Sequence, residues 1–305
     1  MVEHLNFYWK MLKKTFQEWN GSSAAKDSMS LAYAAVFSIP GVLIIIIWVA
    51  GNVLGEEAIR GELSRQIGDV MGREVSKSLE GIIAATLVDK QNWVMKVVGV
   101  LSLIFGATTL FFHLQKSLNS IWGVEAAPEK AIKEFLLNRL NSLIMIVIIG
   151  ILLMSTMLLS SLVSLFNDLI TSLLGTKTYN LIQVLNYVIG FFIMVLVFGL
   201  IYKILPDAKI RWKSVWAGAF VTALLFTLGK FLLSLYFAHL KPASAFGAAG
   251  TVIIIMMWVN YSCMILFFGA AFTKLYSEAK GLGIAPAKHA QWSWLKFGGN
   301  KRQET

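Results

Sequence analysis

Six long apolar runs separate the charged residues of this 305-residue chain, and they constrain its fold more than any other feature. A helix that crosses a bilayer needs about 20 mostly apolar residues, because a rise of about 1.5 Å per residue has to cover roughly 30 Å of hydrocarbon. The composition agrees, since 57% of the residues are hydrophobic, 14% are charged and the mean hydropathy is +0.68. The sequence therefore predicts an all-α polytopic membrane protein with six spans, at residues 30–51, 93–112, 140–164, 187–204, 215–237 and 251–275.

The positive charges are distributed unevenly between the two predicted sides of the membrane. Of the 27 Lys and Arg residues, 18 lie on the side of the two termini, counting Lys203 and Lys274 in the last turns of their spans, and seven lie on the opposite side. The other two, Lys96 and Lys230, lie deeper inside spans. Cytoplasmic loops retain Lys and Arg, so both termini are predicted to be cytoplasmic. The same bias accounts for the net charge of +10 without a nucleic-acid partner.

Three parts follow from these spans. Residues 1–27 carry apolar and basic side chains at helical spacing, which predicts an amphipathic helix in the cytoplasmic interface. Residues 28–278 form the six-helix domain, with a helical outer loop at 52–92 and a hairpin at 160–190 that protrudes beyond the outer surface around a tight turn at Gly175. Residues 279–305 form a basic cytoplasmic tail, which we expect to be mostly flexible and attracted to anionic headgroups.

A polar stripe is predicted on the outer half of the third span. Ser160, Ser164 and either Asn167 or Asp168 recur at three- and four-residue steps, which places them on one helix face. Small polar residues in membranes often serve helix packing, and they also line water-filled vestibules. Both interpretations remain open.

Lys230 is the clearest candidate for a functional residue inside the membrane. A charged side chain near the bilayer centre costs about 2.5 to 3.5 kcal/mol on insertion scales, so it needs a partner, water or a function. Asn260 and Tyr261 fall at nearly the same depth in the sixth span, and the three side chains share a cavity if the two helices face each other. The alternative is that Lys230 is satisfied by carbonyl groups or by the outer interface.

Pro40 lies near the centre of the first span, where the missing amide hydrogen bends a helix. Such a bend lines a pathway or aids packing, and the sequence does not decide between them. We include Pro40 and the nearby Tyr33 among the cavity candidates.

Signatures of catalysis and of cofactor binding are missing from the sequence. Cys263 is the single cysteine, and the four histidines show neither HExxH spacing nor companion carboxylates. Neither a GxSxG elbow nor a phosphate-binding GxxxxGK[ST] loop occurs. The sequence therefore predicts that the protein is not an enzyme and holds no metal or cofactor.

Several short strings, taken together and in order, resemble the YihY/BrkB family of bacterial inner-membrane proteins. The match covers roughly residues 10–278, and its strings are Asp27, Ser30-Leu31-Ala32-Tyr33, Ser38-Ile39-Pro40, Phe105-Gly106-Ala107, Leu118-Asn119, Ile121-Trp122-Gly123, Tyr202-Lys203-Ile204-Leu205-Pro206-Asp207, Gly218-Ala219, Tyr236, Gly247, Gly250, Trp258, Tyr261 and Gly269-Ala270. Where the family commonly reads Gly-Ala-Glu, this chain has Ala271, so a role that depends on that glutamate does not carry over.

The resemblance implies a multi-pass protein of the bacterial inner membrane, whose relatives are linked to serum resistance and to lipid or lipopolysaccharide transport. It also carries the old label ribonuclease BN, which no residue in the chain supports. We expect a transporter or flippase-like protein for a lipid or another amphipathic anionic substrate. The alternatives are an envelope scaffold that moves nothing and an ion or proton-coupled channel. Membrane lipids, envelope proteins and a second copy of the chain are the expected partners.

Overall fold

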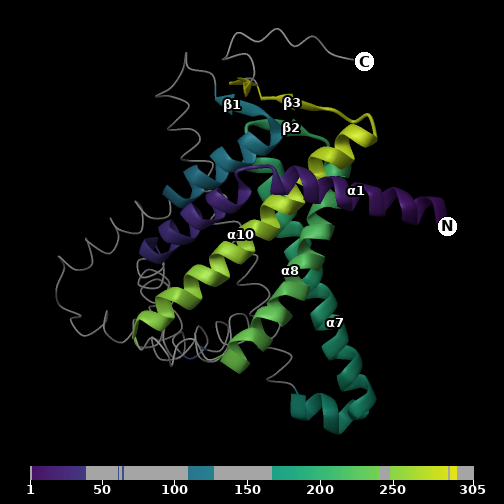
Figure 1. Ribbon diagram of the computed structural model, residues 1–305. Coiled ribbons are helices and arrows are strands. Elements are labelled where there is room, and N and C mark those ends of the chain that lie inside the picture. Colours follow the sequence, from purple (N-terminus) through teal and green to yellow (C-terminus); the bar gives the residue numbers. More distant parts are fainter. Residues whose placement is uncertain are drawn as a thin grey trace. The chain divides into compact units, whose positions relative to one another are not determined.

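The computed structural model describes residues 2–38, 61, 64, 109–126, 167–240, 248–287 and 289–293. Four helices are described in full: α1 (Val2–Asn20), α7 (Asn167–Ile204), α8 (Trp212–Leu240) and α10 (Ala248–Ala279). Residues 24–38 and 109–122 are helical as well. Figure 1 shows these helices together with four short strands.

Three described helices are long and apolar enough to cross a membrane, with candidate spans at Tyr187–Ile204, Trp212–Phe237 and Val252–Ala279. These are the predicted fourth, fifth and sixth spans, with bounds that differ by four residues at most. Most of the predicted first three spans lies outside the described residues. The described parts of the first two, 30–38 and 109–112, are helical. The structure thus supports a membrane protein that is mostly helical.

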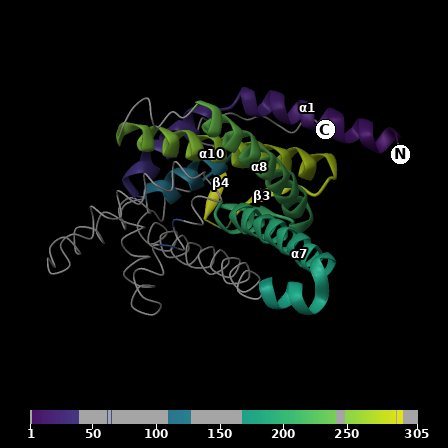
Figure 2. The same cartoon turned by 90° about the horizontal axis from the view of Figure 1, so that it is seen from below.

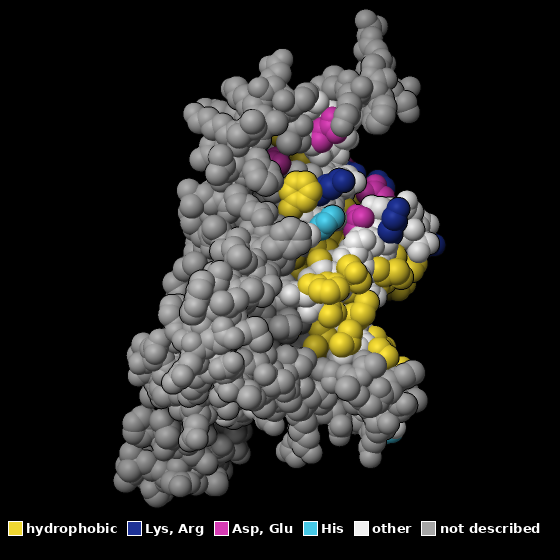
Figure 3. Space-filling view, turned by 90° about the vertical axis from the view of Figure 1, so that its left-hand side faces the viewer, with side chains coloured by type: hydrophobic (Ala, Val, Ile, Leu, Met, Phe, Trp, Pro, Cys, Tyr) yellow, Lys and Arg dark blue, Asp and Glu magenta, His cyan; other side chains and the backbone are white. Residues whose placement is uncertain are grey.

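The apolar surface of α8 agrees with a lipid environment. Trp216, Phe220, Leu224, Leu228 and Phe231 follow one another at three- or four-residue steps, and each is between 42% and 60% exposed. Residues at this spacing share one face of a helix. A row of large exposed hydrophobic side chains is stable in hydrocarbon and unstable in water. Hydrophobic side chains also form broad patches on the described part of the surface in Figure 3.

The ends of the long helices follow from the local sequence. α7 ends at Ile204, two residues before Pro206, because a proline disfavours helical geometry in the residue before it. α10 ends in a Schellman motif: Gly281 has φ of +62°, the Leu282 amide donates to the Ser277 carbonyl at 2.9 Å, and the Gly281 amide donates to the Glu278 carbonyl at 3.0 Å.

Four three-residue strands correct the prediction that the chain is purely α-helical. β1 (Val124–Ala126) pairs antiparallel with β4 (Ala290–Trp292), so that Val124 lies opposite Trp292. β2 (Ala208–Ile210) pairs antiparallel with β3 (Ile284–Pro286), so that Ala208 lies opposite Pro286. The strands join segments that are far apart in the sequence, which is why the apolar runs did not reveal them.

The strands also correct the expectation of a mostly flexible tail after residue 278. The chain leaves α10 through Gly281 and Gly283, which both have positive φ, and enters β3. The Ser277 hydroxyl donates to the Gly283 carbonyl at 3.1 Å, and β4 follows β3 after a short turn. Residues 281–287 and 289–293 are therefore part of the fold, and residues 294–305 lie outside the described residues.

The tight turn predicted at Gly175 falls in the first part of α7, which is helical from Asn167 to Ile204. Figure 1 shows that α7 changes direction in its first half. Residues 160–166, in the first arm of the hairpin predicted at 160–190, lie outside the described residues. The hairpin therefore stays a prediction. The same holds for the outer loop at 52–92, of which only residues 61 and 64 are described.

Backbone contacts divide the chain into two compact units. Unit 1 consists of Met1–Ile121 and Leu225–Ala271, and unit 2 of Trp122–Leu224 and Phe272–Thr305. In unit 1, Trp19 at the end of α1 packs edge-on against Phe268 of α10, with ring centroids 6.1 Å apart. In unit 2, Trp122 and Tyr202 pack edge-on with centroids 6.2 Å apart, and both are at most 2% exposed.

Candidate functional site

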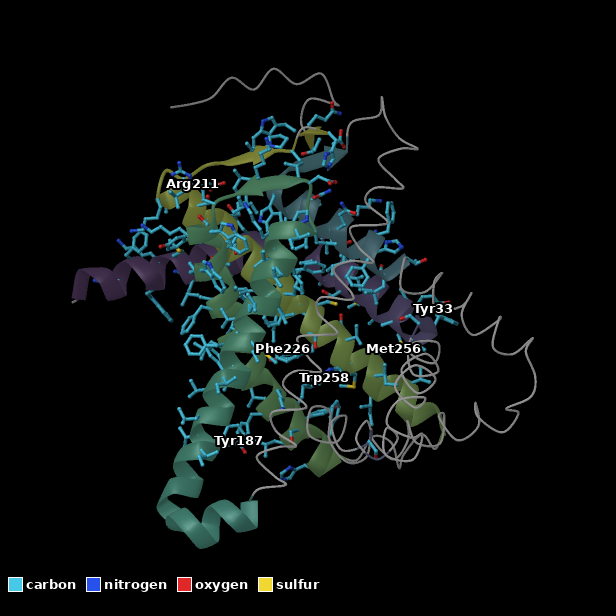
Figure 4. All side chains as sticks on the ribbon, turned by 180° about the vertical axis from the view of Figure 1, so that it is seen from behind. Tyr33, Tyr187, Arg211, Phe226, Met256 and Trp258 are labelled. Carbon is cyan, nitrogen blue, oxygen red and sulfur yellow. The ribbon has the colours of Figure 1, made fainter. Side chains whose placement is uncertain are left out.

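In unit 1, α8 and α10 come close together at the depth where Lys230 lies. A Cβ atom built on Gly229 would lie 1.6 Å from the hydroxyl oxygen of Tyr261, so the tyrosine side chain occupies the space that a larger residue would need. Phe226, one turn earlier on α8, packs edge-on against Trp258 of α10 at 5.9 Å between centroids. Figure 2 shows the two helices side by side, and Figure 4 shows the Phe226 and Trp258 side chains close together.

Asn260, next to Tyr261 on α10, carries a polar group that is only partly satisfied. Its Oδ1 atom is buried and has no hydrogen-bond partner among the described residues. Its Nδ2 atom donates to the sulfur of Met264 at 3.8 Å, and a thioether is a weak acceptor. An unsatisfied buried amide oxygen costs about 1 to 3 kcal/mol. Asn260 is therefore a group that a ligand would satisfy.

Lys230 follows Gly229 directly and is half-buried. Thr227 lies three residues before it and Ser234 four residues after it, and both are exposed. The three side chains therefore form a polar stripe on one face of a helix that is otherwise apolar enough to span a bilayer. Thr227 and Ser234 are not among the residues predicted from the sequence, although their spacing from Lys230 was a usable signal.

The structure describes some of the predicted site residues and not others. Gly229, immediately before Lys230, lies against Tyr261, so α8 and α10 are in contact at this depth. That the Lys230, Asn260 and Tyr261 side chains share a cavity stays a prediction. Tyr33 is 61% exposed and packs on Phe37 with centroids 5.0 Å apart, and Figure 4 shows it pointing outward from its helix. Three predicted residues lie outside the described residues: Pro40, Ser160 and Ser164. Two others, whose side chains the structure does not describe, lie in the first turn of α7: Asn167 and Asp168.

A second polar cluster lies in unit 2, around the string that begins with Tyr202. The Tyr202 hydroxyl is 2.8 Å from the Thr222 hydroxyl, and the Thr222 hydroxyl donates to the Gly218 carbonyl at 2.7 Å. Because Thr222 has one hydroxyl proton, Tyr202 is the donor in the first of these bonds. Tyr202 and Thr222 are both completely buried. This pair ties the end of α7 to the first half of α8.

The statement that the histidines lack companion carboxylates is wrong for His289, which pairs with Asp207 at the end of the same string. The carboxylate is 5% exposed, and its Oδ1 atom lies 2.9 Å from His289 Nε2. The Asp207 carbonyl also accepts a hydrogen bond from the Ala287 amide at 2.9 Å. These bonds hold the chain segment after α10 against β2. The two residues are 82 positions apart, so spacing in the sequence gave no signal.

The described contacts of the cluster in unit 2 connect segments that are distant in the sequence. Within the described residues, no three His, Cys, Asp or Glu side chains come together as a metal site would require. Ala271, where the resemblance leads one to expect glutamate, is 4% exposed and lies in the apolar interior. The polar contact of α8 and α10 is therefore the better candidate for a functional site.

Comparisons with known proteins assign the chain to a family. The family model described as "Virulence factor BrkB" matches residues 15–293, which is nearly the whole chain. The chain belongs to the Virulence factor BrkB family. The strings that resembled this family lie within the matched range, so the resemblance noted from the sequence is confirmed.

The relatives of this BrkB-family chain include bacterial proteins named as membrane proteins. A UPF0761 membrane protein of Pseudoalteromonas atlantica is 26% identical over 80% of this chain and 78% of its own length. Those of Haemophilus influenzae and Aggregatibacter aphrophilus are 27% and 25% identical, over 82% and 89% of this chain and 88% and 94% of their own lengths. No solved structure matches the chain. The protein is thus an integral membrane protein of this family.

Proposed function

We propose that this protein moves an anionic lipid or a similar amphipathic anion across the bilayer, along the polar stripe of α8 beside α10. The observation that carries the proposal is the buried oxygen of Asn260, which has no hydrogen-bond partner among the described residues. Asn260 is next in sequence to Tyr261, whose side chain lies against Gly229. An unsatisfied polar group inside a membrane is costly, and a bound ligand that donates a hydrogen bond to this oxygen would remove the cost.

The surroundings of Lys230 suit an amphipathic substrate. Thr227, Lys230 and Ser234 offer hydroxyl and ammonium groups to an anionic headgroup, and they lie on one helix face. Leu228 and Phe231, which flank Lys230, are 55% and 60% exposed and offer contact to acyl chains. A headgroup that passes along the stripe would exchange water for these polar groups while its tails stay in hydrocarbon.

The proposal includes a topology and a location. The chain crosses the bacterial inner membrane six times with both termini in the cytoplasm, as the Lys and Arg distribution favours. Reporter fusions at both termini test this arrangement, and reporters on opposite sides of the membrane would contradict it. Transport in this scheme is not driven by a reaction that the chain itself catalyses.

A lipid-translocation assay tests the proposal directly. The purified protein is reconstituted into vesicles that contain a fluorescent phosphatidylglycerol, and the fraction of label that reaches the outer leaflet is measured by chemical quenching. Lys230→Met is expected to slow translocation at least tenfold, whereas Lys230→Arg, which keeps the charge, should retain most of the rate. Asn260→Leu, which removes the unpaired oxygen, should also slow it.

The same assay separates transport from the alternatives. If wild-type protein moves no lipid, or if Lys230→Met moves it at the wild-type rate, the proposal is wrong. The hypothesis of an envelope scaffold would then remain. It predicts that the Lys230→Met variant still complements a deletion strain. A channel would instead release an entrapped ion from the same vesicles without translocating the labelled lipid.

A further inference from the structure

The connection between α7 and α8 has to lie at a surface of the membrane. The two helices are consecutive, and their candidate spans, Tyr187–Ile204 and Trp212–Phe237, are separated by seven residues. We refer to residues 203–216 as the α7–α8 junction. It contains the end of one span, β2, and the first turns of the next.

The α7–α8 junction concentrates positive charge. Four of its residues are cationic: Lys203, Lys209, Arg211 and Lys213. The single acid in it, Asp207, is 5% exposed and hydrogen-bonded to His289. The exposed charge of the α7–α8 junction is therefore positive, since the side chains at 209, 211 and 213 are exposed and the carboxylate is not.

Two indole rings lie among these cations. Trp212 and Trp216 stack with centroids 5.9 Å apart and an interplanar angle of 28°, and they are 45% and 42% exposed. Lys203 Nζ lies 5.5 Å from the centroid of the Trp212 ring and donates to the Ile210 carbonyl. Cation–π contact and the hydrogen bond hold this ammonium in place. Tryptophan beside lysine at the end of a span is typical of the headgroup layer.

β2 fixes the direction of one further cation. Ala208 and Ile210 are buried and Lys209 between them is exposed, as alternation along a strand requires. Pairing with β3 keeps this register. Figure 4 shows Arg211 next to the paired strands. Three cations of the α7–α8 junction are thus carried by a strand or by helix ends, and Arg211 is the single residue between β2 and α8. Ordering such positions on binding loses less conformational entropy than ordering a mobile loop would.

From this arrangement we infer that the α7–α8 junction binds the phosphate-bearing headgroups of anionic phospholipids such as phosphatidylglycerol. Cations and indoles at the end of two apolar helices match a molecule that has both a phosphate and acyl chains. Ile204, which is 41% exposed and adjoins Lys203, extends the apolar side of this surface. The inference requires that the chain lies in a membrane, and it does not require that the protein transports anything.

Binding is measured with the full chain, purified in a neutral detergent and stripped of lipid. Phosphatidylglycerol, phosphatidylcholine or inorganic phosphate is added, and the melting temperature and the lipid adducts seen by native mass spectrometry are recorded. The double variant Arg211→Gln with Lys213→Gln removes two exposed cations from the α7–α8 junction. The control, Lys26→Gln with Lys116→Gln, removes the same charge from two exposed positions of unit 1.

We expect phosphatidylglycerol to raise the melting temperature of the wild type more than phosphatidylcholine does. Loss of two interfacial cations should weaken the affinity for phosphatidylglycerol roughly 30-fold, at about fivefold per cation, and the control should keep the wild-type affinity. Wild-type affinity in the junction variant would overturn the inference. An equal loss in both variants would overturn it as well, since it would show a dependence on net charge alone. Stabilisation by inorganic phosphate equal to that by lipid would overturn the assignment to a lipid.

Discussion

Replacing Gly229 with alanine would place a methyl group where Tyr261 already lies. The added Cβ would be 1.6 Å from the tyrosine hydroxyl oxygen and 2.2 and 2.4 Å from two ring carbons. Carbon atoms in contact are normally about 3.5 to 4.0 Å apart. Tyr261 would have to move by more than an ångström, or the two helices would have to separate.

The size of the effect follows from measured overpacking. Extra methyl groups in a well-packed interior typically cost about 1 to 3 kcal/mol, and the preference of alanine over glycine in a helix offsets about 1 kcal/mol of this. The net cost is up to about 2 kcal/mol, and at about 2 to 4 °C per kcal/mol the melting temperature should fall by up to roughly 8 °C. The assay is thermal unfolding of the purified protein in detergent, with size-exclusion chromatography to follow the folded fraction.

Gly199 supplies the matched control. It is also a buried glycine in a candidate span, but an added Cβ would meet its nearest neighbours, on Ala219, Trp216 and Val215, at 3.8 Å. That is ordinary contact, and alanine favours a helix over glycine by about 1 kcal/mol. Gly199→Ala should therefore leave the melting temperature unchanged or raise it slightly.

A second-site change distinguishes the clash from other causes. Tyr261→Ala alone leaves a cavity and should destabilise the protein. Combined with Gly229→Ala, it should cost less than the sum of the two single changes, because the new methyl group occupies space that the ring has left. The explanation would be refuted if Gly229→Ala melted like the wild type, or if the two effects simply added.

Three further changes test the contacts of unit 2. Tyr202→Phe removes the hydrogen bond to Thr222 and should lower the melting temperature by the equivalent of about 0.5 to 1.5 kcal/mol, with no effect expected if the bond is not formed. Gly281→Ala puts a side chain at φ of +62° and should cost about 1 to 2 kcal/mol; unchanged melting would exclude the cap. His289→Ala removes a partner of Asp207 and should speed limited proteolysis after α10, and an unchanged cleavage rate would show that this pair does not hold the segment.

The described spans could be predicted because their signal is local. The bounds of the fourth span were predicted to the residue, and those of the fifth and sixth within four residues. Hydrophobic length alone decides such a segment, since backbone groups in lipid have to be satisfied within the same helix. The strings that resemble the family could likewise be recognised from the sequence, because each is a short, continuous segment such as Ser30-Leu31-Ala32-Tyr33.

The contacts between distant segments could not be predicted in this way. A strand of three residues is too short for its alternation to be recognised in the sequence. Gln291 donates to Glu125 across a separation of 166 positions, which no local pattern reveals. The close contact between Gly229 and Tyr261 depends on how two helices cross, which no periodicity reveals. A partial signal did exist for the segment after α10: Gly281 and Gly283 bracket the end of a helix and precede an apolar residue, a pattern that favours a defined turn over a flexible tail.

The polar side chains of the long helices differ in how far their hydrogen bonds are satisfied, and this difference supports the proposed site at Asn260. The hydroxyl groups of Thr222 and Ser262 each donate to a carbonyl one turn earlier, at 2.7 and 2.8 Å. Placing these hydroxyl groups in hydrocarbon therefore costs little free energy. The side-chain amide of Asn260 has an oxygen as well as an NH2 group, and a backbone carbonyl cannot donate to that oxygen. The oxygen has no partner among the described residues. A leucine would fill that position at lower cost. The position next to Tyr261 therefore carries an energetic penalty that packing does not require, and a bound headgroup that donates a hydrogen bond to this oxygen would remove it.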